Sequence, residues 1–94
     1  MVGVLAKIKI KLGTNSEFEE AIKKMSMAVR DNEKGNLYYD VFNGEDDTTY
    51  IVMEKYNDQS DLDAHSKSDH FRSIGKEMGQ FMDGAPEVKV LTSI

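Results

Sequence analysis

Apolar and polar residues alternate at the start of the chain. Six apolar residues share one parity: Val2, Val4, Ala6, Ile8, Ile10 and Leu12. Lys7, Lys9 and Lys11 occupy the other parity. A period of two with one apolar side predicts a β-strand that is buried on one face.

The apolar spacing then becomes helical. Thr14 followed by Glu17 is typical of a capping box at the start of a helix. Apolar residues next recur at steps of three and four, as Phe18, Ala21, Ile22, Met25, Ala28 and Val29. This stripe predicts a helix of roughly four turns with one apolar face. We expect Gly35 to end it as a C′ glycine.

Two strands and a turn follow. Residues 36–43 and 49–56 are rich in β-forming side chains, and Asn43-Gly44 lies in the turn between them. This pattern predicts a β-hairpin with a slightly long acidic loop. Beyond it, Asp58 is a favourable residue to start a helix, with Asp61 as a favourable charge in the first turn.

The last part of the chain predicts a broken helix and a final strand. Ser68 can cap a second helical segment. Its apolar stripe comprises Phe71, Ile74, Met78, Phe81 and Met82. Gly75 and Gly79 share one face despite their cost in helix propensity, so we expect close packing against the sheet there. Gly84 and Pro86 end the segment, and residues 87–94 alternate as a strand.

The predicted order is strand, helix, strand, strand, broken helix, strand. This is the split βαβ arrangement of a ferredoxin-like α+β domain, with a four-stranded antiparallel sheet and helices on one face. A length of 94 residues indicates a single domain over residues 1–94. Both hairpin strands are apolar on both faces, and the helices can cover only one. We therefore expect a second copy to cover the other face in a C2 homodimer.

Composition excludes several classes of function. Lys and Arg number 12 against 17 Asp and Glu, a net charge of −5 that argues against nucleic acid and against an anionic membrane surface as partners. The chain has no Cys, which excludes disulfides, thiolate nucleophiles and Cys-ligated metals. No apolar run is long enough for a membrane span or a signal peptide, so a cytoplasmic location is expected.

Glu54 is the first candidate for chemistry. It interrupts an apolar strand face between Val52 and Tyr56. Partial desolvation there would raise the pKa of its carboxyl group and suit a general base. The plainer interpretation is a Glu paired with a Lys or with its dimer mate.

His65 and His70 are the only histidines. Five positions apart on one continuous helix, they would point about 140° apart, unlike a helical metal-binding pair. Only a helix break near Ser68 could bring them together, and no third ligand is evident, so no metal site is expected. Each histidine could be a base or a structural residue.

The four tyrosines lie in the hairpin, as Tyr38, Tyr39, Tyr50 and Tyr56. They could line a pocket for a flat ring, but for most of them a buried core residue with a bonded hydroxyl is the favoured interpretation. For Asp40, a cross-strand or interface pair with a Lys is favoured over catalysis.

Three segments resemble a known family. They are GNLYYDVF (35–42), YIVMEKY (50–56) and LDAHSKSDHF (62–71). The matching positions are Gly35, Leu37, Tyr39, Asp40, Glu54, Tyr56, Ala64, His65, Ser68, His70 and Phe71. In this combination they resemble the antibiotic biosynthesis monooxygenase domain family, including its quinol monooxygenase-like members.

The resemblance implies a dimeric α+β barrel and an activity. Many members oxygenate quinols or anthrones without metal or flavin: the substrate is deprotonated, gives an electron to O₂ and recombines. We therefore expect a cofactor-independent monooxygenase whose partners are a small-molecule substrate and O₂. His65 or Glu54 would be the base. The expected substrate-binding residues are Tyr39, Tyr56, His70 and Phe71.

Three other functions are weighed beside this one. The stretch GNLYYDV is also similar to an isomerase of a phosphorylated hydroxy-diketone from quorum-signal processing. The phosphate group of that substrate would need a cationic site, for which the candidates are Lys7, Lys9, Lys11 and Lys55. A non-catalytic small-molecule-binding module is a further possibility. Haem degradation is disfavoured, because the first strand has no Asn and the chain has no Trp.

Overall fold

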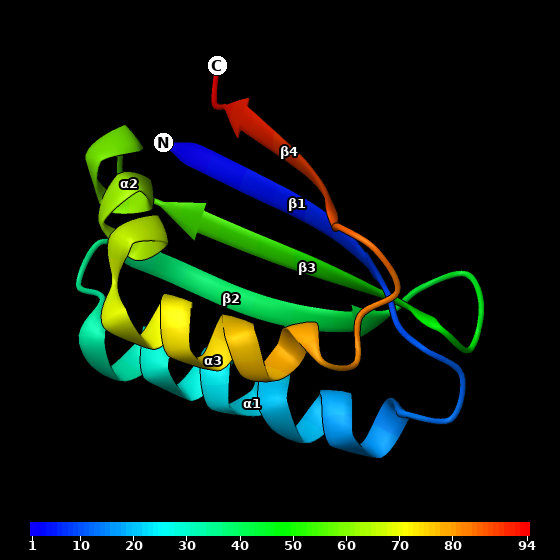
Figure 1. Cartoon of the computed structure of the whole chain (residues 1–94). Helices are drawn as coiled ribbons and strands as arrows, with labels where there is room; N and C mark the ends of the chain where they lie inside the picture. Colours follow the sequence, from blue (N-terminus) through cyan, green and yellow to red (C-terminus); the bar gives the residue numbers. More distant parts are fainter.

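The computed structural model describes all 94 residues as a four-stranded antiparallel sheet with three helices (Figure 1). The elements in chain order are β1 (Val2–Lys9), α1 (Asn15–Asn32), β2 (Asn36–Asn43), β3 (Thr49–Tyr56), α2 (Gln59–Lys67), α3 (Asp69–Gly79) and β4 (Glu87–Thr92). The strand order in the sheet is β2-β3-β1-β4. The predicted α+β class, with its split βαβ topology, is confirmed.

The helices cover one face of the sheet, and α1 and α3 lie side by side on it (Figure 1). The apolar parity of β1 is buried against them, as the alternation predicted. The prediction is wrong for Leu12, which lies beyond the end of the strand and is exposed. The stripe of α1 is buried through Phe18, Ala21, Ile22, Met25 and Val29. This face therefore holds the core. None of the helices is both long and apolar enough to cross a bilayer.

Glu54 lies on the covered face, in one of the two inner strands of the sheet. In the register of the sheet, Glu54 on β3 is opposite Val4 on β1 and opposite Tyr39 on β2. Because side chains alternate along a strand, Val52 and Tyr56 point to the same side as Glu54. The sheet thus places a carboxylate among apolar and aromatic neighbours.

The capping interactions predicted for the two ends of α1 are both wrong. Thr14 occupies the N-cap position, but its backbone is not extended and its hydroxyl donates to the carbonyl of Lys11 at 2.7 Å. The hydroxyl accepts no hydrogen bond from the first turn, so no capping box with Glu17 forms. Gly35 does not have a positive φ, so it is not a C′ glycine. It is required for close approach: a Cβ at this position would overlap the carboxylate of Asp61.

The break between α2 and α3 is confirmed. Asp58 caps α2 by accepting from the backbone N–H of Asp61 at 3.0 Å. Ser68 ends α2 and starts α3: its hydroxyl donates to the carbonyl of His65 at 2.7 Å and accepts from the N–H of Phe71 at 3.2 Å. The backbone of Ser68 is extended, which redirects the chain between the two helices.

The expectation for the glycines of α3 is wrong. A Cβ at Gly75 or Gly79 would meet no other atom within 4 Å, so neither glycine packs closely against the sheet. Phe81 and Met82 lie beyond the end of α3, where they pack against the core. The space beside Gly75 belongs instead to a cavity described below.

The outer face of the sheet carries exposed apolar side chains. Tyr38 and Phe42 of β2, Met53 of β3 and Leu91 of β4 are all more than 40% exposed. They alternate with inward-facing residues such as Tyr39 and Val52, as the two-faced hairpin pattern predicted.

Candidate active site

A cavity of about 560 Å³ lies between the inner face of the sheet and the helices α2 and α3. Of its 20 lining residues, 12 are hydrophobic, so its wall is mainly apolar. Val4, Met78 and Val88 contribute to this wall, whereas Glu54 and His65 are polar groups on it. An apolar cavity with a few converging polar groups is the usual form of a small-molecule site.

Glu54 is held by its neighbour two positions along β3. The hydroxyl of Tyr56 donates to Oε1 of Glu54 at 2.6 Å, and both residues are buried. Burial raises the pKa of the Glu54 carboxyl group, although the Tyr56 hydrogen bond and the nearby His65 oppose this shift. Burial beside Glu54 also raises the pKa of Tyr56, so the phenol remains protonated and continues to donate.

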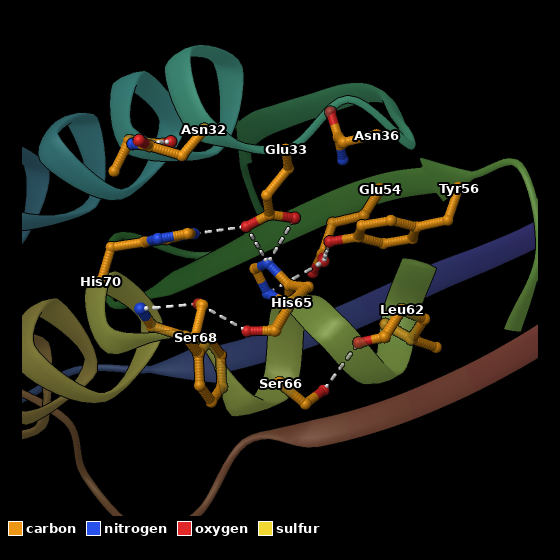
Figure 2. A network of polar contacts seen from close by, with 12 residues as sticks. Asn32, Glu33, Asn36, Glu54, Tyr56, Leu62, His65, Ser66, Ser68 and His70 are labelled. Carbon is orange, nitrogen blue, oxygen red and sulfur yellow. Dashed lines mark hydrogen bonds and ion pairs between the residues drawn. The ribbon is translucent and has the colours of Figure 1, made fainter. Parts of the chain in front are cut away.

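His65 lies in the last turn of α2, with only 3% of its surface exposed. Its Nδ1 is 2.8 Å from Oε2 of Glu33, and its Nε2 is 3.7 Å from Oε1 of Glu54 (Figure 2). A carboxylate at hydrogen-bond distance favours the proton on Nδ1. The neutral ring then presents an acceptor lone pair at Nε2, on the side of Glu54 and the cavity.

Aromatic rings fix the orientation of the His65 imidazole. The ring of Phe71 contacts it edge-on, with centroids 4.9 Å apart. The rings of Tyr56 and Tyr39 lie 5.5 Å and 6.2 Å away. These contacts leave the ring little freedom to rotate, so the direction of its two nitrogens is set by packing as well as by hydrogen bonds.

Glu33 is a site residue that the sequence did not reveal. It follows α1 directly, as its C-cap residue. Its carboxylate also contacts His70 of α3, where Nε2 lies 2.5 Å from Oε2 (Figure 2). No spacing in the sequence connects Glu33 to either histidine, because 32 and 37 residues separate it from them.

Two premises of the prediction that there is no metal site do not hold in the structure. The break at Ser68 does bring His65 and His70 together, and Glu33 supplies a third group with ligand character. One ligand atom from each of Glu33, His65 and His70 lies within 4.8 Å of the others. We refer to these three residues as the two-histidine cluster.

The expected substrate-binding residues fall into two groups. Tyr39 and Phe71 line the cavity. Tyr56 and His70 do not line it: Tyr56 bonds to Glu54, and His70 bonds to Glu33. Burial raises the pKa of Tyr39, and the nearby Glu54 adds to the shift. Tyr39 can therefore act as a hydrogen-bond donor toward the cavity.

The lysines considered for phosphate binding lie outside the cavity lining, and the cation on its wall is Arg72. Lys7 pairs with Glu45 at 2.6 Å, and Lys11 donates to the carbonyl of Gln80 at 2.9 Å. Arg72 is largely exposed and pairs with Asp69 at 3.1 Å. The cavity thus presents one cation, at its rim.

Comparison with known proteins gives a consistent result. The family profile described as antibiotic biosynthesis monooxygenase matches residues 1–77. A Bacillus subtilis protein named putative monooxygenase YcnE is 31% identical over 83 residues, covering 83% of this chain and 85% of that protein.

Solved structures agree over nearly the whole chain. A Caulobacter crescentus protein described as a putative antibiotic biosynthesis monooxygenase superposes with a TM-score of 0.94 at 31% identity, covering 99% of this chain and 89% of that one. The Mycobacterium tuberculosis protein Rv0793 shares the fold, with a TM-score of 0.89 at 24% identity, covering 99% of this chain and 94% of that one.

Proposed function

The chain belongs to the antibiotic biosynthesis monooxygenase family, and on that premise we propose that it oxygenates a small phenolic or enolisable substrate, such as a quinol or an anthrone, by direct reaction with O₂. In this reaction a base first removes an acidic proton from the substrate. The resulting anion gives an electron to O₂, and the two radicals recombine. One oxygen atom remains in the product and the other leaves as water. No flavin or metal takes part in the proposed reaction.

The row formed by Glu33, His65 and Glu54 is the observation that supports this function best, because His65 and Glu54 line the cavity and Glu33 lies behind them. Glu33 holds Nδ1 of His65 at 2.8 Å, which leaves Nε2 free to accept a proton on the cavity side. We therefore assign His65 as the base and Glu33 as the residue that orients it. The arrangement follows the logic of a carboxylate and an imidazole acting together in general base catalysis, which contributes about 10²–10⁴-fold to a rate.

Glu54 has a separate role in this proposal. Its carboxylate lies 3.7 Å from Nε2 of His65, so it stabilises the imidazolium that forms when the ring accepts a proton. Because burial raises its pKa, Glu54 is also the second candidate for the base. Substituting each residue separately distinguishes the two roles.

The shape of the cavity suits a ring substrate. Its apolar wall would bury the ring, and the hydroxyl of Tyr39 would donate to the substrate oxygen. Phe71 contributes an aromatic face next to His65. The proton to be removed would then lie near Nε2 of His65.

Oxygen uptake with a panel of quinols and anthrones tests the proposal. Purified protein in excess chelator should consume O₂ above the rate of autoxidation. H65Q should lower turnover by about 10²–10⁴-fold. E77Q, which changes an exposed carboxylate that pairs with Lys24, should not. Isomerisation of a phosphorylated hydroxy-diketone without O₂ uptake would contradict the proposal, as would the absence of turnover across the panel.

We also propose that a second copy of the chain covers the outer face of the sheet. Tyr38, Phe42, Met53 and Leu91 expose apolar surface there, and no helix of the chain reaches that face. Burying such a face between two copies follows the usual logic of a symmetric dimer. Light scattering should give twice the chain mass of 10.6 kDa at micromolar concentration. M53E should shift the species toward the monomer.

A further inference from the structure

The two-histidine cluster joins three separate elements through ligand-type atoms. Glu33 follows α1, His65 ends α2 and His70 begins α3 (Figure 2). Oε2 of Glu33 lies 2.8 Å from Nδ1 of His65 and 2.5 Å from Nε2 of His70. One nitrogen of each ring therefore points toward the same carboxylate.

This set of donors suits a transition-metal ion. Two imidazole nitrogens and one carboxylate oxygen are ligands that Zn²⁺, Fe²⁺ and Co²⁺ accept. With bonds of about 2.0–2.1 Å, the donors of a tetrahedral site lie about 3.3 Å apart. The two carboxylate–imidazole contacts of 2.8 Å and 2.5 Å would have to widen by less than about 1 Å. All three ligand atoms lie within 4.8 Å of one another, so binding would also require the side chains of His65 and His70 to adjust around the ion.

The surroundings of His65 are those of a metal-binding histidine. Such a residue usually directs its second ring nitrogen to a carboxylate or a carbonyl. Nε2 of His65 faces Glu54 at 3.7 Å, and Glu54 is fixed in turn by the hydroxyl of Tyr56. The side chain of His70 is 18% exposed, which leaves the cluster open to solvent on the α3 side. An ion could enter there and keep a water ligand.

We propose that the two-histidine cluster binds one divalent transition-metal ion through Glu33, Nδ1 of His65 and Nε2 of His70. The ion lies behind His65 as seen from the cavity, because neither Glu33 nor His70 lines the cavity. It therefore does not touch the substrate. A neutral His65 bound through Nδ1 carries its proton on Nε2, so the ring can no longer accept a proton from the substrate. The ion is consequently an inhibitor, a consequence that rests on the proposed function.

Co²⁺ is the probe for binding, because its visible absorption bands report nitrogen and oxygen ligands without any turnover. The protein is prepared without a histidine tag, stripped with chelator and titrated. The wild type should bind one Co²⁺ per chain and unfold at a higher temperature with the metal than without it. E33Q and H70Q should each weaken binding at least about tenfold, because the loss of even an outer-shell partner of a metal ligand costs this much. E77Q should bind as the wild type does.

Two results would overturn the metal site. One is the absence of new absorption bands in folded wild-type protein at millimolar Co²⁺. The other is unchanged affinity in both E33Q and H70Q, with folding verified by circular dichroism. The wild-type titration decides the matter even where a variant fails to fold.

The inhibitory role is tested separately by adding Zn²⁺ to the oxygen-uptake assay. Zn²⁺ should lower the rate of the wild type and should have a smaller effect on H70Q, each relative to its own metal-free rate. A rate that rises with the metal would overturn the inhibitory role while leaving the site intact. Protein that binds Co²⁺ but turns over no substrate would contradict the proposed function and not the site.

Discussion

Glu33 and His65 are 32 residues apart in the chain, yet the carboxylate of one lies 2.8 Å from Nδ1 of the other. His65 is almost fully buried, so this contact replaces the water that would otherwise solvate Nδ1. The pair converges because α1 ends where α2 ends, on the same side of the sheet.

Glu33→Gln should reduce turnover at least about tenfold, since the amide no longer favours the proton on Nδ1 of His65. The substrate does not touch Glu33, so KM should change little while kcat falls. Steady-state oxygen uptake measures both constants. An equal rise in KM with unchanged kcat would show that Glu33 supports the cavity wall and does not position the base.

Glu54→Gln should raise thermal stability at neutral pH. Burial raises the pKa of Glu54 in the folded state, so its stabilising contribution is present below the pKa of the unfolded chain and is lost as pH rises through the folded pKa. Gln is neutral at every pH and can still accept from Tyr56. The gain in Tm over the wild type should therefore be a few degrees at neutral pH.

The decisive measurement is the difference in Tm between Glu54→Gln and the wild type as a function of pH, with chelator present. The difference in Tm should shrink as pH falls below the ordinary pKa of Glu, about 4.3. His65, Tyr56, Tyr39 and Glu33 surround the group and are unchanged in the variant. A gain that does not vary with pH would show that packing, and not the charge of Glu54, causes it.

Gly75→Leu should narrow the cavity. Gly75 lines the cavity, and a Cβ added there would meet no atom within 4 Å. A leucine side chain would therefore extend into the volume that the proposed substrate occupies. We expect kcat/KM for ring substrates to fall at least about tenfold, as expected for a blocked apolar pocket. The kcat/KM for smaller substrates should fall less.

Gly79→Leu is the matched control. Gly79 also has open space at its Cβ but does not line the cavity. Both substitutions remove a glycine from α3, which favours the helix by up to about 1 kcal/mol. Activity should therefore fall in G75L alone, with Tm maintained in both. Equal losses of activity would attribute the effect to α3 as a whole.

Gly35→Ala should destabilise the fold and disturb the site. Its Cβ would overlap the carboxylate of Asp61 in the first turn of α2. Overpacking of this kind costs about 1–3 kcal/mol in the free energy of unfolding. The same clash would displace α2 and with it His65. Urea unfolding and oxygen uptake measure the two effects.

The double variant G35A/D61A should recover most of the lost stability, because it removes the group that the new methyl meets. Burial and the neighbouring Asp58 already raise the pKa of Asp61, so its charge is not well accommodated there. Additive losses in the double variant would exclude the clash as the cause.

Much of the fold could be predicted because each element carries its own periodicity. The alternation of Val2 to Ile10 and the spacing of Phe18 to Val29 reflect which side of each element is buried. Glu54 and His65 could be selected because they interrupt such apolar patterns. Asp58 and Ser68 identified the starts of α2 and α3 through local capping chemistry.

The predictions that are wrong concern residues whose sequence signal fits more than one structural role. Gly75 and Gly79 reduce helix propensity whether they face a strand or an empty cavity, so packing could not be distinguished from open space. Thr14 has capping chemistry, but the backbone conformation there turns its hydroxyl toward Lys11. Glu33 gives no signal at all, because its role depends on three elements that meet only after folding.

The break at Ser68 also fixes how many residues can separate His65 from His70. His65 and His70 face one carboxylate because a fixed number of residues, with one extended backbone position among them, rotates the second helix relative to the first. One inserted or deleted residue would turn His70 by about 100° around the axis of α3 and remove it from Glu33. The hairpin loop at residues 44–48 is under no such constraint. Among proteins that share this fold and both histidines, insertions and deletions should therefore occur between β2 and β3 and be absent between the two histidines.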